Sequence, residues 1–131
     1  MNVLLSIRPK YAQKIFSGEK RFEFRKRKPR QAVGRVFVYE CHPSRTIVGW
    51  FSVSQIHSGP PGEIWEKCKE SGGIDEEAYF SYCRGKKAIH ALEIDQVFRF
   101  EPPMNPIDTF GDFRPPQDFV YLDGDMLEHQ V

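Results

Sequence analysis

The 131-residue sequence contains no long apolar run and has only three cysteines. Its apolar N-terminal stretch, Val3 to Leu5, is followed by Arg8 and is too short for a secretory signal or a membrane span. Cys41, Cys68 and Cys83 form no CxxC pair and cannot all be bridged within one chain, as is typical of a reducing compartment. We therefore expect a cytoplasmic protein with free thiols and no membrane association.

The sequence also has few closely spaced metal ligands. Cys41 adjoins His42, but neighbouring residues of a strand point to opposite faces and make a poor ligand pair. Cys68 and Cys83 fall on probable helices, where unoxidised cysteine is commonly a small core residue. We expect no metal site and no cofactor. Since the chain has no internal repeat and no linker, we expect a single domain over residues 1–131.

Charge is distributed unevenly, although the formal net charge is only +1. Residues 1–45 hold twelve Lys or Arg and three Glu, a balance of +9, whereas residues 46–131 hold seven against fifteen acids, or −8. Such a charge run can be an ordinary solvated surface. A basic half beside an acidic half also suits a face that receives an anionic ligand.

The basic residues are concentrated after a probable helix end at Gly18. Pro9 opens this helix, and Gly18 is expected to end it with a positive φ. Seven basic residues follow between Lys20 and Arg30. On a strand, Phe22 and Phe24 would face one side. The opposite side would carry a row of charged groups, namely Arg21, Glu23, Arg25 and Arg27.

The remaining pattern predicts a mixture of strands and helices. Strands are expected at 3–7, 35–41, 46–55 and 87–100, and helices after Pro60 and from Asp75 as an N-cap. Rings and branched residues occur on both faces of the 35–41 strand, which indicates a well-covered sheet. The tail is rich in proline but holds too many apolar groups to be disordered. This order favours an α+β fold around a small barrel.

Several segments resemble the ASCH domain family. Gly18, Lys20 and Glu23 match its GxKxxE signature, and residues 4–25, 73–77, 88–92 and 115–119 are similar to small bacterial and phage ASCH proteins. The resemblance implies a PUA-like, mostly antiparallel small β-barrel, with a helix after the first strand and a helical pair before the long fifth strand. It also implies a cleft between the first helix and the barrel, where the signature residues lie.

The resemblance implies RNA or nucleotide recognition, the activity to which most family members are assigned. Some members have been linked to RNA cleavage, and one branch hydrolyses the amide of N4-acylated cytidine with a signature lysine, a threonine on the same strand and a helical glutamate. Lys20 matches that lysine, but Glu23 stands where the threonine would fall. Three residues are candidates for the helical glutamate, namely Glu66, Glu70 and Glu76.

The first prediction is therefore a module that binds RNA, a nucleotide or a nucleoside in this cleft. Glu23 would accept hydrogen bonds from a base edge or a 2′-OH. The expected phosphate contacts are Arg8, Lys20, Arg21, Arg25 and Arg27. The alternative is an amidohydrolase or ribonuclease in which Lys20 and Glu23 transfer protons.

Other groups have both a structural and a functional interpretation. Trp50 and Trp65 could stack on a base but are more typical of a core, and His57 could shuttle protons. Catalysis would also need a hydroxyl partner in the cleft, such as Thr46 or Ser54. A third possibility, a protein-interaction module, would require an exposed apolar patch. The sequence does not predict the oligomeric state.

Overall fold

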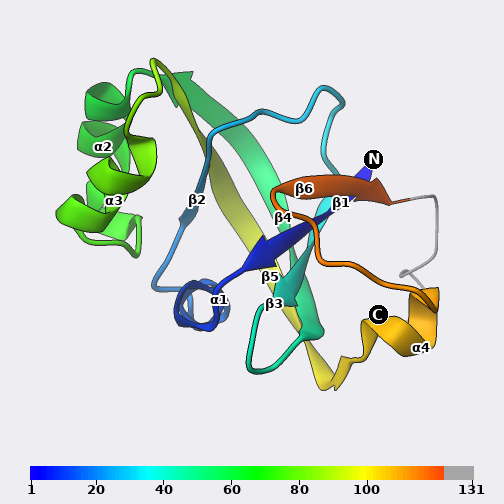
Figure 1. The fold of residues 1–131 in the computed structure, drawn as a ribbon. Coiled ribbons are helices and arrows are strands. Elements are labelled where there is room, and N and C mark those ends of the chain that lie inside the picture. The colour runs from blue at the N-terminus through cyan, green and yellow to red at the C-terminus, as the bar shows by residue number, and fades with distance from the viewer. Residues whose placement is uncertain (123–131) are drawn as a thin grey trace.

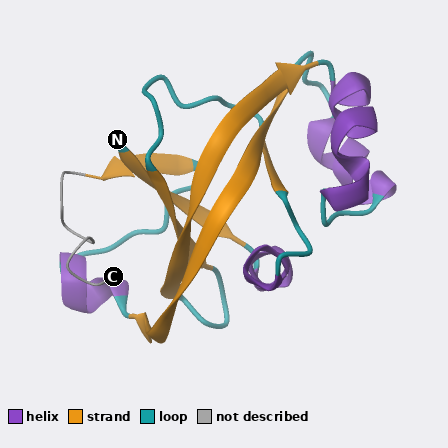
Figure 2. Cartoon of the chain, turned by 180° about the vertical axis from the view of Figure 1, so that it is seen from behind, coloured by secondary structure: helices purple, strands orange, loops and turns teal. Residues whose placement is uncertain are grey.

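The computed structural model describes residues 1–122, which form a curled six-stranded sheet with helices around it (Figures 1 and 2). Its strands are β1 (Asn2–Ile7), β2 (Phe22–Arg25), β3 (Arg35–Glu40), β4 (Thr46–Gly59), β5 (Ile89–Met104) and β6 (Phe119–Leu122). The order across the sheet is β2-β5-β4-β3-β1-β6. Strands β1 and β3 are parallel and the other pairs are antiparallel. This arrangement confirms the predicted α+β, mostly antiparallel PUA-like fold as a half-barrel with open edges at β2 and β6.

The helices lie where the sequence predicts them. Helix α1 (Pro9–Ser17) follows β1, and α2 (Pro61–Cys68), a 3-10 turn η1 (Lys69–Ser71) and α3 (Glu76–Cys83) separate β4 from β5. Asp75 caps α3, since its side chain accepts a hydrogen bond from the backbone N–H of Ala78. Figure 1 shows α2 and α3 together beyond one end of the long β4 and β5 strands.

The structure corrects the predicted bounds in several places. Strand β2 is shorter than the predicted row, since it spans only Phe22–Arg25 and leaves Arg21 and Arg27 outside it. Strands β4 and β5 are longer, since they pair with each other as far as Gly59 and Ile89 at one end and Ile47 and Met104 at the other. The tail contains two elements that the sequence does not predict, the short helix α4 (Pro106–Phe110) and β6.

Apolar side chains cover both faces of the central strands. Val36 and Val38 of β3 pack in one buried cluster with α1, and Phe37 and Tyr39 pack in another. A third cluster lies beneath α2 and α3. The sheet is thus covered as the pattern of β3 predicts. The candidate site lies between the two open edges of this sheet, β2 and β6.

The turn after α1 places the signature residues. Gly18 has φ of +88°, and its N–H bonds to the carbonyl of Ile15, as expected for a glycine that ends a helix. The backbone N–H of Lys20 then bonds back to the carbonyl of Lys14. Residues 18–21 therefore form a turn ahead of β2.

The remaining features concern the cysteines and the length of the helices. The cysteines at 41, 68 and 83 are all unpaired. No helix within residues 1–122 is both long and apolar enough to cross a membrane.

Candidate functional site

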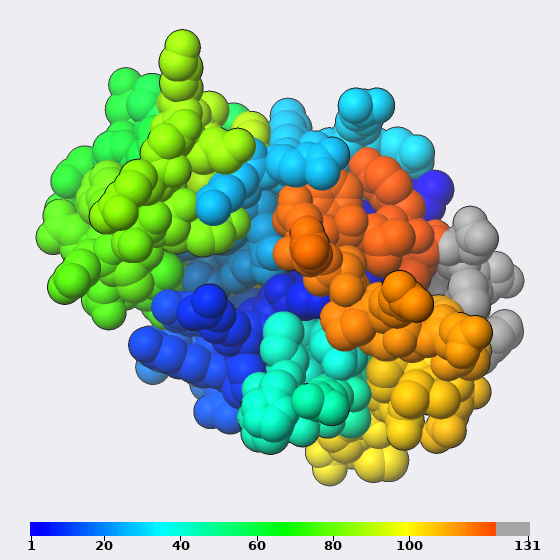
Figure 3. Space-filling view, in the orientation of Figure 1, coloured from blue at the N-terminus to red at the C-terminus, as the bar shows by residue number. Residues whose placement is uncertain are grey.

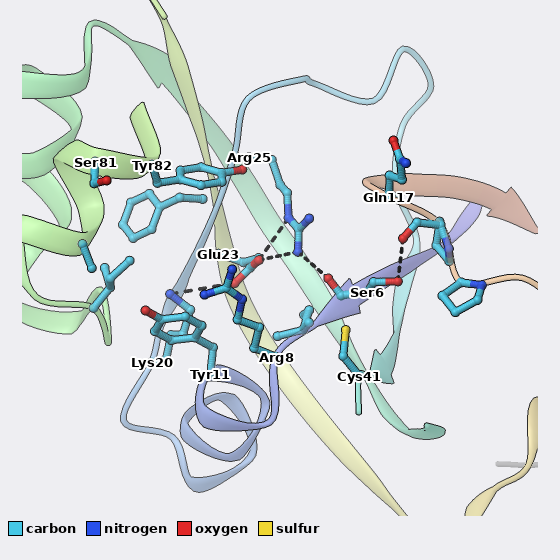
Figure 4. A pocket seen from close by; sticks show the side chains of 16 residues that line it. Ser6, Arg8, Tyr11, Lys20, Glu23, Arg25, Cys41, Ser81, Tyr82 and Gln117 are labelled. Atoms are coloured by element: carbon cyan, nitrogen blue, oxygen red, sulfur yellow. Dashed lines mark hydrogen bonds and ion pairs between the residues drawn. The ribbon is translucent and has the colours of Figure 1, made fainter. Parts of the chain in front are cut away.

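A cavity of about 640 Å³ opens between the two edges of the half-barrel. Its walls come from the end of β1, helices α1 and α3, strand β2 and the segment Pro115–Gln117 before β6 (Figure 4). In Figure 3, the surface is recessed where the green helical region, the blue N-terminal elements and the orange segment before β6 meet. The cavity occupies the place where the family resemblance implies a cleft.

Lys20 is buried in the wall of this cavity, with only 2% of its surface exposed. Its Nζ atom donates a hydrogen bond of 2.5 Å to the carbonyl of Gly72 and lies 3.8 Å from Oε1 of Glu23. The rings of Tyr11 and Phe24 flank the ammonium group, with centroids 5.4 and 4.9 Å away. Burial lowers the pKa of Lys20, and the charge of Glu23 partly opposes that effect.

Arg25 extends inward and holds Glu23 from the other side. Its Nη2 and Nε atoms donate to Oε2 of Glu23 at 2.7 and 3.0 Å, and Nη2 also donates to the carbonyl of Ser6. Its Nη1 atom lies 3.5 Å from Asp118. Burial tends to lower the pKa of Arg25, but the Glu23 carboxylate outweighs it and the pKa is raised. The guanidinium is therefore a fixed positive charge.

Glu23 keeps one oxygen available. Both Arg25 bonds end on Oε2, whereas Oε1 has no hydrogen bond from a described residue and faces Lys20 beyond hydrogen-bond distance. The side chain is only 8% exposed. Oε1 can thus accept a hydrogen bond from a ligand that enters the cavity (Figure 4).

Hydroxyl and aromatic groups complete the lining. Tyr11 and Tyr82 stand on opposite walls, on α1 and α3. Burial raises the pKa of Tyr82 to about 12, so its hydroxyl keeps its proton at neutral pH. Ser6 Oγ donates a bond of 2.7 Å to the carbonyl of Pro116 and so ties the C-terminal segment to β1. Burial also raises the pKa of the Cys41 thiol, which stays protonated.

The structure brings together four of the six predicted site residues, namely Arg8, Lys20, Glu23 and Arg25. Arg27 lines an adjoining groove, and Arg21 lines neither space. The expected row of exposed guanidinium groups on β2 is wrong for Arg25, because its ion pair with Glu23 draws it into the protein.

Other predicted candidates lie elsewhere. Thr46 and Ser54 are absent from the cavity lining, as are the three helical glutamates at 66, 70 and 76. Trp50 and Trp65 are both core residues at 8% exposure, and His57 pairs with Glu93 instead of facing the cavity. Within residues 1–122, no group of three or more His, Cys, Asp or Glu is placed to hold a metal ion.

Sequence reasoning missed several lining residues. No local pattern marks Ser6, Tyr11 or Tyr82 as facing a cavity. The contribution of Pro115–Gln117 depends on a contact with β1 across 110 positions of the chain. Only the resemblance of residues 115–119 to the end of ASCH proteins pointed to this segment.

Comparisons with known proteins agree with the resemblance. A ribonuclease of Zymomonas mobilis, named ASCH domain-containing ribonuclease, is 27% identical over 91% of this chain and 82% of its own length. The crystal structure of ASCH from Zymomonas mobilis superposes with a TM-score of 0.90 at 24% identity, over 97% of this chain and 91% of that one. Large ribosomal subunit protein uL22 of Ureaplasma parvum is 31% identical over 92% of this chain, which spans only 39% of that protein. Residues 5–103 match the ASCH domain, and the chain belongs to the ASCH domain family.

Proposed function

We propose that this protein is a cytoplasmic RNA-binding domain that takes one nucleotide of a single strand into the cavity around Lys20. The observation that carries the proposal is the charge of the lining. Three cationic side chains, Arg8, Lys20 and Arg25, line the cavity with Glu23, the only carboxylate that residues 1–122 contribute to the lining. The excess positive charge in a partly enclosed space favours an anionic ligand.

The size and the other walls favour a nucleotide as that ligand. A cavity of about 640 Å³ lies within the range typical of small-molecule sites. Tyr11 and Tyr82 offer ring surfaces to a base, and exposed Arg8 offers a guanidinium to a phosphate. The open oxygen of Glu23 offers an acceptor to an amino group of the base or to the 2′-OH that distinguishes RNA from DNA.

Binding by an unstacked nucleotide requires a single strand. Bases in a duplex are stacked and cannot enter a pocket without being extruded, at a cost of a few kcal/mol. The name of the Zymomonas mobilis relative, a ribonuclease, supports RNA as the ligand class.

RNA cleavage in the same cavity is the second candidate, favoured by the buried Lys20 beside Glu23. In this reaction the 2′-oxygen attacks the adjacent phosphorus, and the bond from phosphorus to the 5′-oxygen breaks. The Glu23 carboxylate or the neutral Lys20 amine would accept the 2′-OH proton, and a protonated group would supply one to the departing 5′-oxygen. Arg8 and Arg25 would stabilise the charge on the phosphoryl oxygens. The products would be a 2′,3′-cyclic phosphate and a 5′-hydroxyl end.

Hydrolysis of an acylated cytidine has less support. That chemistry requires a threonine and a helical glutamate beside the lysine, according to the family resemblance. Glu23 takes the place of the threonine, and no glutamate of α2, η1 or α3 lines the cavity.

Both candidates can be tested with one pair of variants. Fluorescence anisotropy should show single-stranded RNA binding by the parent and at least about tenfold weaker binding by Lys20→Met. Lys67→Met is the matched control, since Lys67 is exposed on α2 and outside the cavity. Equal affinity in all three proteins, or no binding by the parent, would overturn the proposal. Separation of end-labelled RNA on a gel then tests cleavage, which Lys20→Met should abolish and Lys67→Met should retain.

A further inference from the structure

A second groove adjoins the cavity along the open side of the half-barrel. It has a volume of about 710 Å³ and lies between the end of β2, the end of α3 and the segment that leads into β6. Arg25, Tyr82, Pro116 and Gln117 line both spaces. The cavity and the groove therefore form one continuous depression. In Figure 3 its light-blue, yellow-green and orange walls lie beside one another.

The groove is more basic than the cavity. It adds four exposed cationic side chains from three segments of the chain, namely Lys26, Arg27, Lys86 and Arg114. None of these four is within 4.0 Å of a carboxylate among residues 1–122. The one acid that the described residues bring to the groove, Asp118, lies 3.5 Å from Arg25. Four such charges converging on one depression favour a ligand with several anionic groups.

A further cation lies at the junction of the two spaces. The ammonium group of Lys26 lies 4.7 Å from the ring centroid of Tyr82, one of the residues that line both the cavity and the groove. Arg25 lines the junction as well, but its guanidinium is paired with Glu23 and lies 3.5 Å from Asp118. A phosphodiester that leaves the cavity would thus meet the ammonium group of Lys26.

We propose that the groove holds the phosphates next to the nucleotide in the cavity, so that a single RNA strand runs between the edges of β2 and β6. This inference rests on the proposed function and assigns Lys86 and Arg114 as RNA-binding residues. Continuity with the cavity favours a nucleic acid strand over an acidic peptide. Phosphates of a strand recur at short intervals, so a ligand held in the cavity places its neighbours in the groove.

The test compares two double variants by anisotropy with a labelled single-stranded RNA octanucleotide at several salt concentrations. Lys86→Ala with Arg114→Ala removes two groove charges. Lys67→Ala with Arg99→Ala is the control, because both residues are exposed and line neither space. Loss of two phosphate contacts should weaken binding at least tenfold and reduce the magnitude of the salt slope by about 1.4, at about 0.7 for each phosphate of a single strand. The control should change neither quantity.

The outcomes separate this inference from the proposed function. The groove variant could bind RNA and respond to salt like the parent while Lys20→Met loses affinity. That result would overturn the RNA-binding role of the groove and leave the proposed role of the cavity intact. A parent that binds no RNA would overturn both. An acidic peptide that binds the parent more tightly than the RNA octanucleotide, and the groove variant more weakly than the parent, would also count against the strand. Competition by a nucleoside monophosphate should be equally effective in the groove variant and the parent, because the groove lies outside the nucleotide cavity.

Discussion

The Nζ atom of Lys20 lies 3.8 Å from Oε1 of Glu23, close enough for an ion pair but too far for a hydrogen bond. The lysine is held instead by the carbonyl of Gly72, and the glutamate by Arg25. Each member of the pair is therefore positioned independently of the other. A ligand group in the cavity can contact both atoms without breaking the contacts that hold them in place.

Lys20 should affect stability in a pH-dependent way. The pKa of Lys20 is 10.5 in the unfolded chain and lower in the folded protein. At pH values between the two pKa values, the unfolded chain therefore binds more protons than the folded chain. The free energy of unfolding should thus rise with pH in this window, relative to Lys20→Met. Chemical denaturation of both proteins at a series of alkaline pH values measures the difference. A difference that stays constant or falls as pH rises would show that the lysine is not destabilised by burial.

Substitution of Arg25 and of Arg27 should affect different properties, although the two residues lie only two positions apart. Arg25 should matter for stability and Arg27 for RNA binding. Arg25→Ala leaves the buried Glu23 carboxylate without its main partner and should lower the free energy of unfolding by about 3 kcal/mol. Arg27→Ala alters an exposed side chain and should change stability by less than about 0.5 kcal/mol. Its effect should appear in RNA binding, where the salt slope would fall by about 0.7. Thermal melts and salt titrations of both variants give the comparison, and similar melts would argue against the inward position of Arg25.

Substitution by alanine should destabilise the protein more at Gly73 than at Gly18, although both glycines have a positive φ. A Cβ at Gly18 meets no atom within 4 Å, so Gly18→Ala should cost about 1 kcal/mol of backbone strain. A Cβ at Gly73 would lie 2.6 Å from Cβ of Lys20. Gly73→Ala should cost a further 1–3 kcal/mol, roughly, because the neighbouring side chain must move.

The same two glycine variants also separate folding from binding. Gly73→Ala should weaken RNA binding even under conditions in which it is fully folded, since it displaces Lys20. Gly18→Ala should bind as the parent does. Equal binding by the two variants would mean that the position of Lys20 is unimportant for the ligand.

Much of the fold followed from local patterns in the sequence. Pro9, Gly18 and Asp75 correctly marked the ends of helices, and the alternation of rings and valines on β3 correctly indicated a sheet covered on both faces. These signals are short-range, because capping and side-chain direction depend on a few neighbouring residues. Strand β6 was missed because its partner, β1, lies more than 110 residues away in the chain.

The site was predictable only in part for the same reason. The GxKxxE pattern pointed to Lys20 and Glu23, which both line the cavity, but it could not show that Arg25 would turn inward to bind Glu23 and the carbonyl of Ser6. Nor could it place Tyr82 or Pro116 on the opposite wall. Those positions depend on the packing of α3 and of the C-terminal segment against β1 and β2.

The most direct test is the crystal structure of this protein with a short single-stranded RNA. We expect one nucleotide in the cavity, with a phosphate in hydrogen-bond distance of Arg8, its base against Tyr11 or Tyr82, and an acceptor contact from Oε1 of Glu23. The next phosphate should lie toward Lys26 and the groove. RNA bound only on another face, with the cavity around Lys20 filled by solvent, would contradict the proposed function.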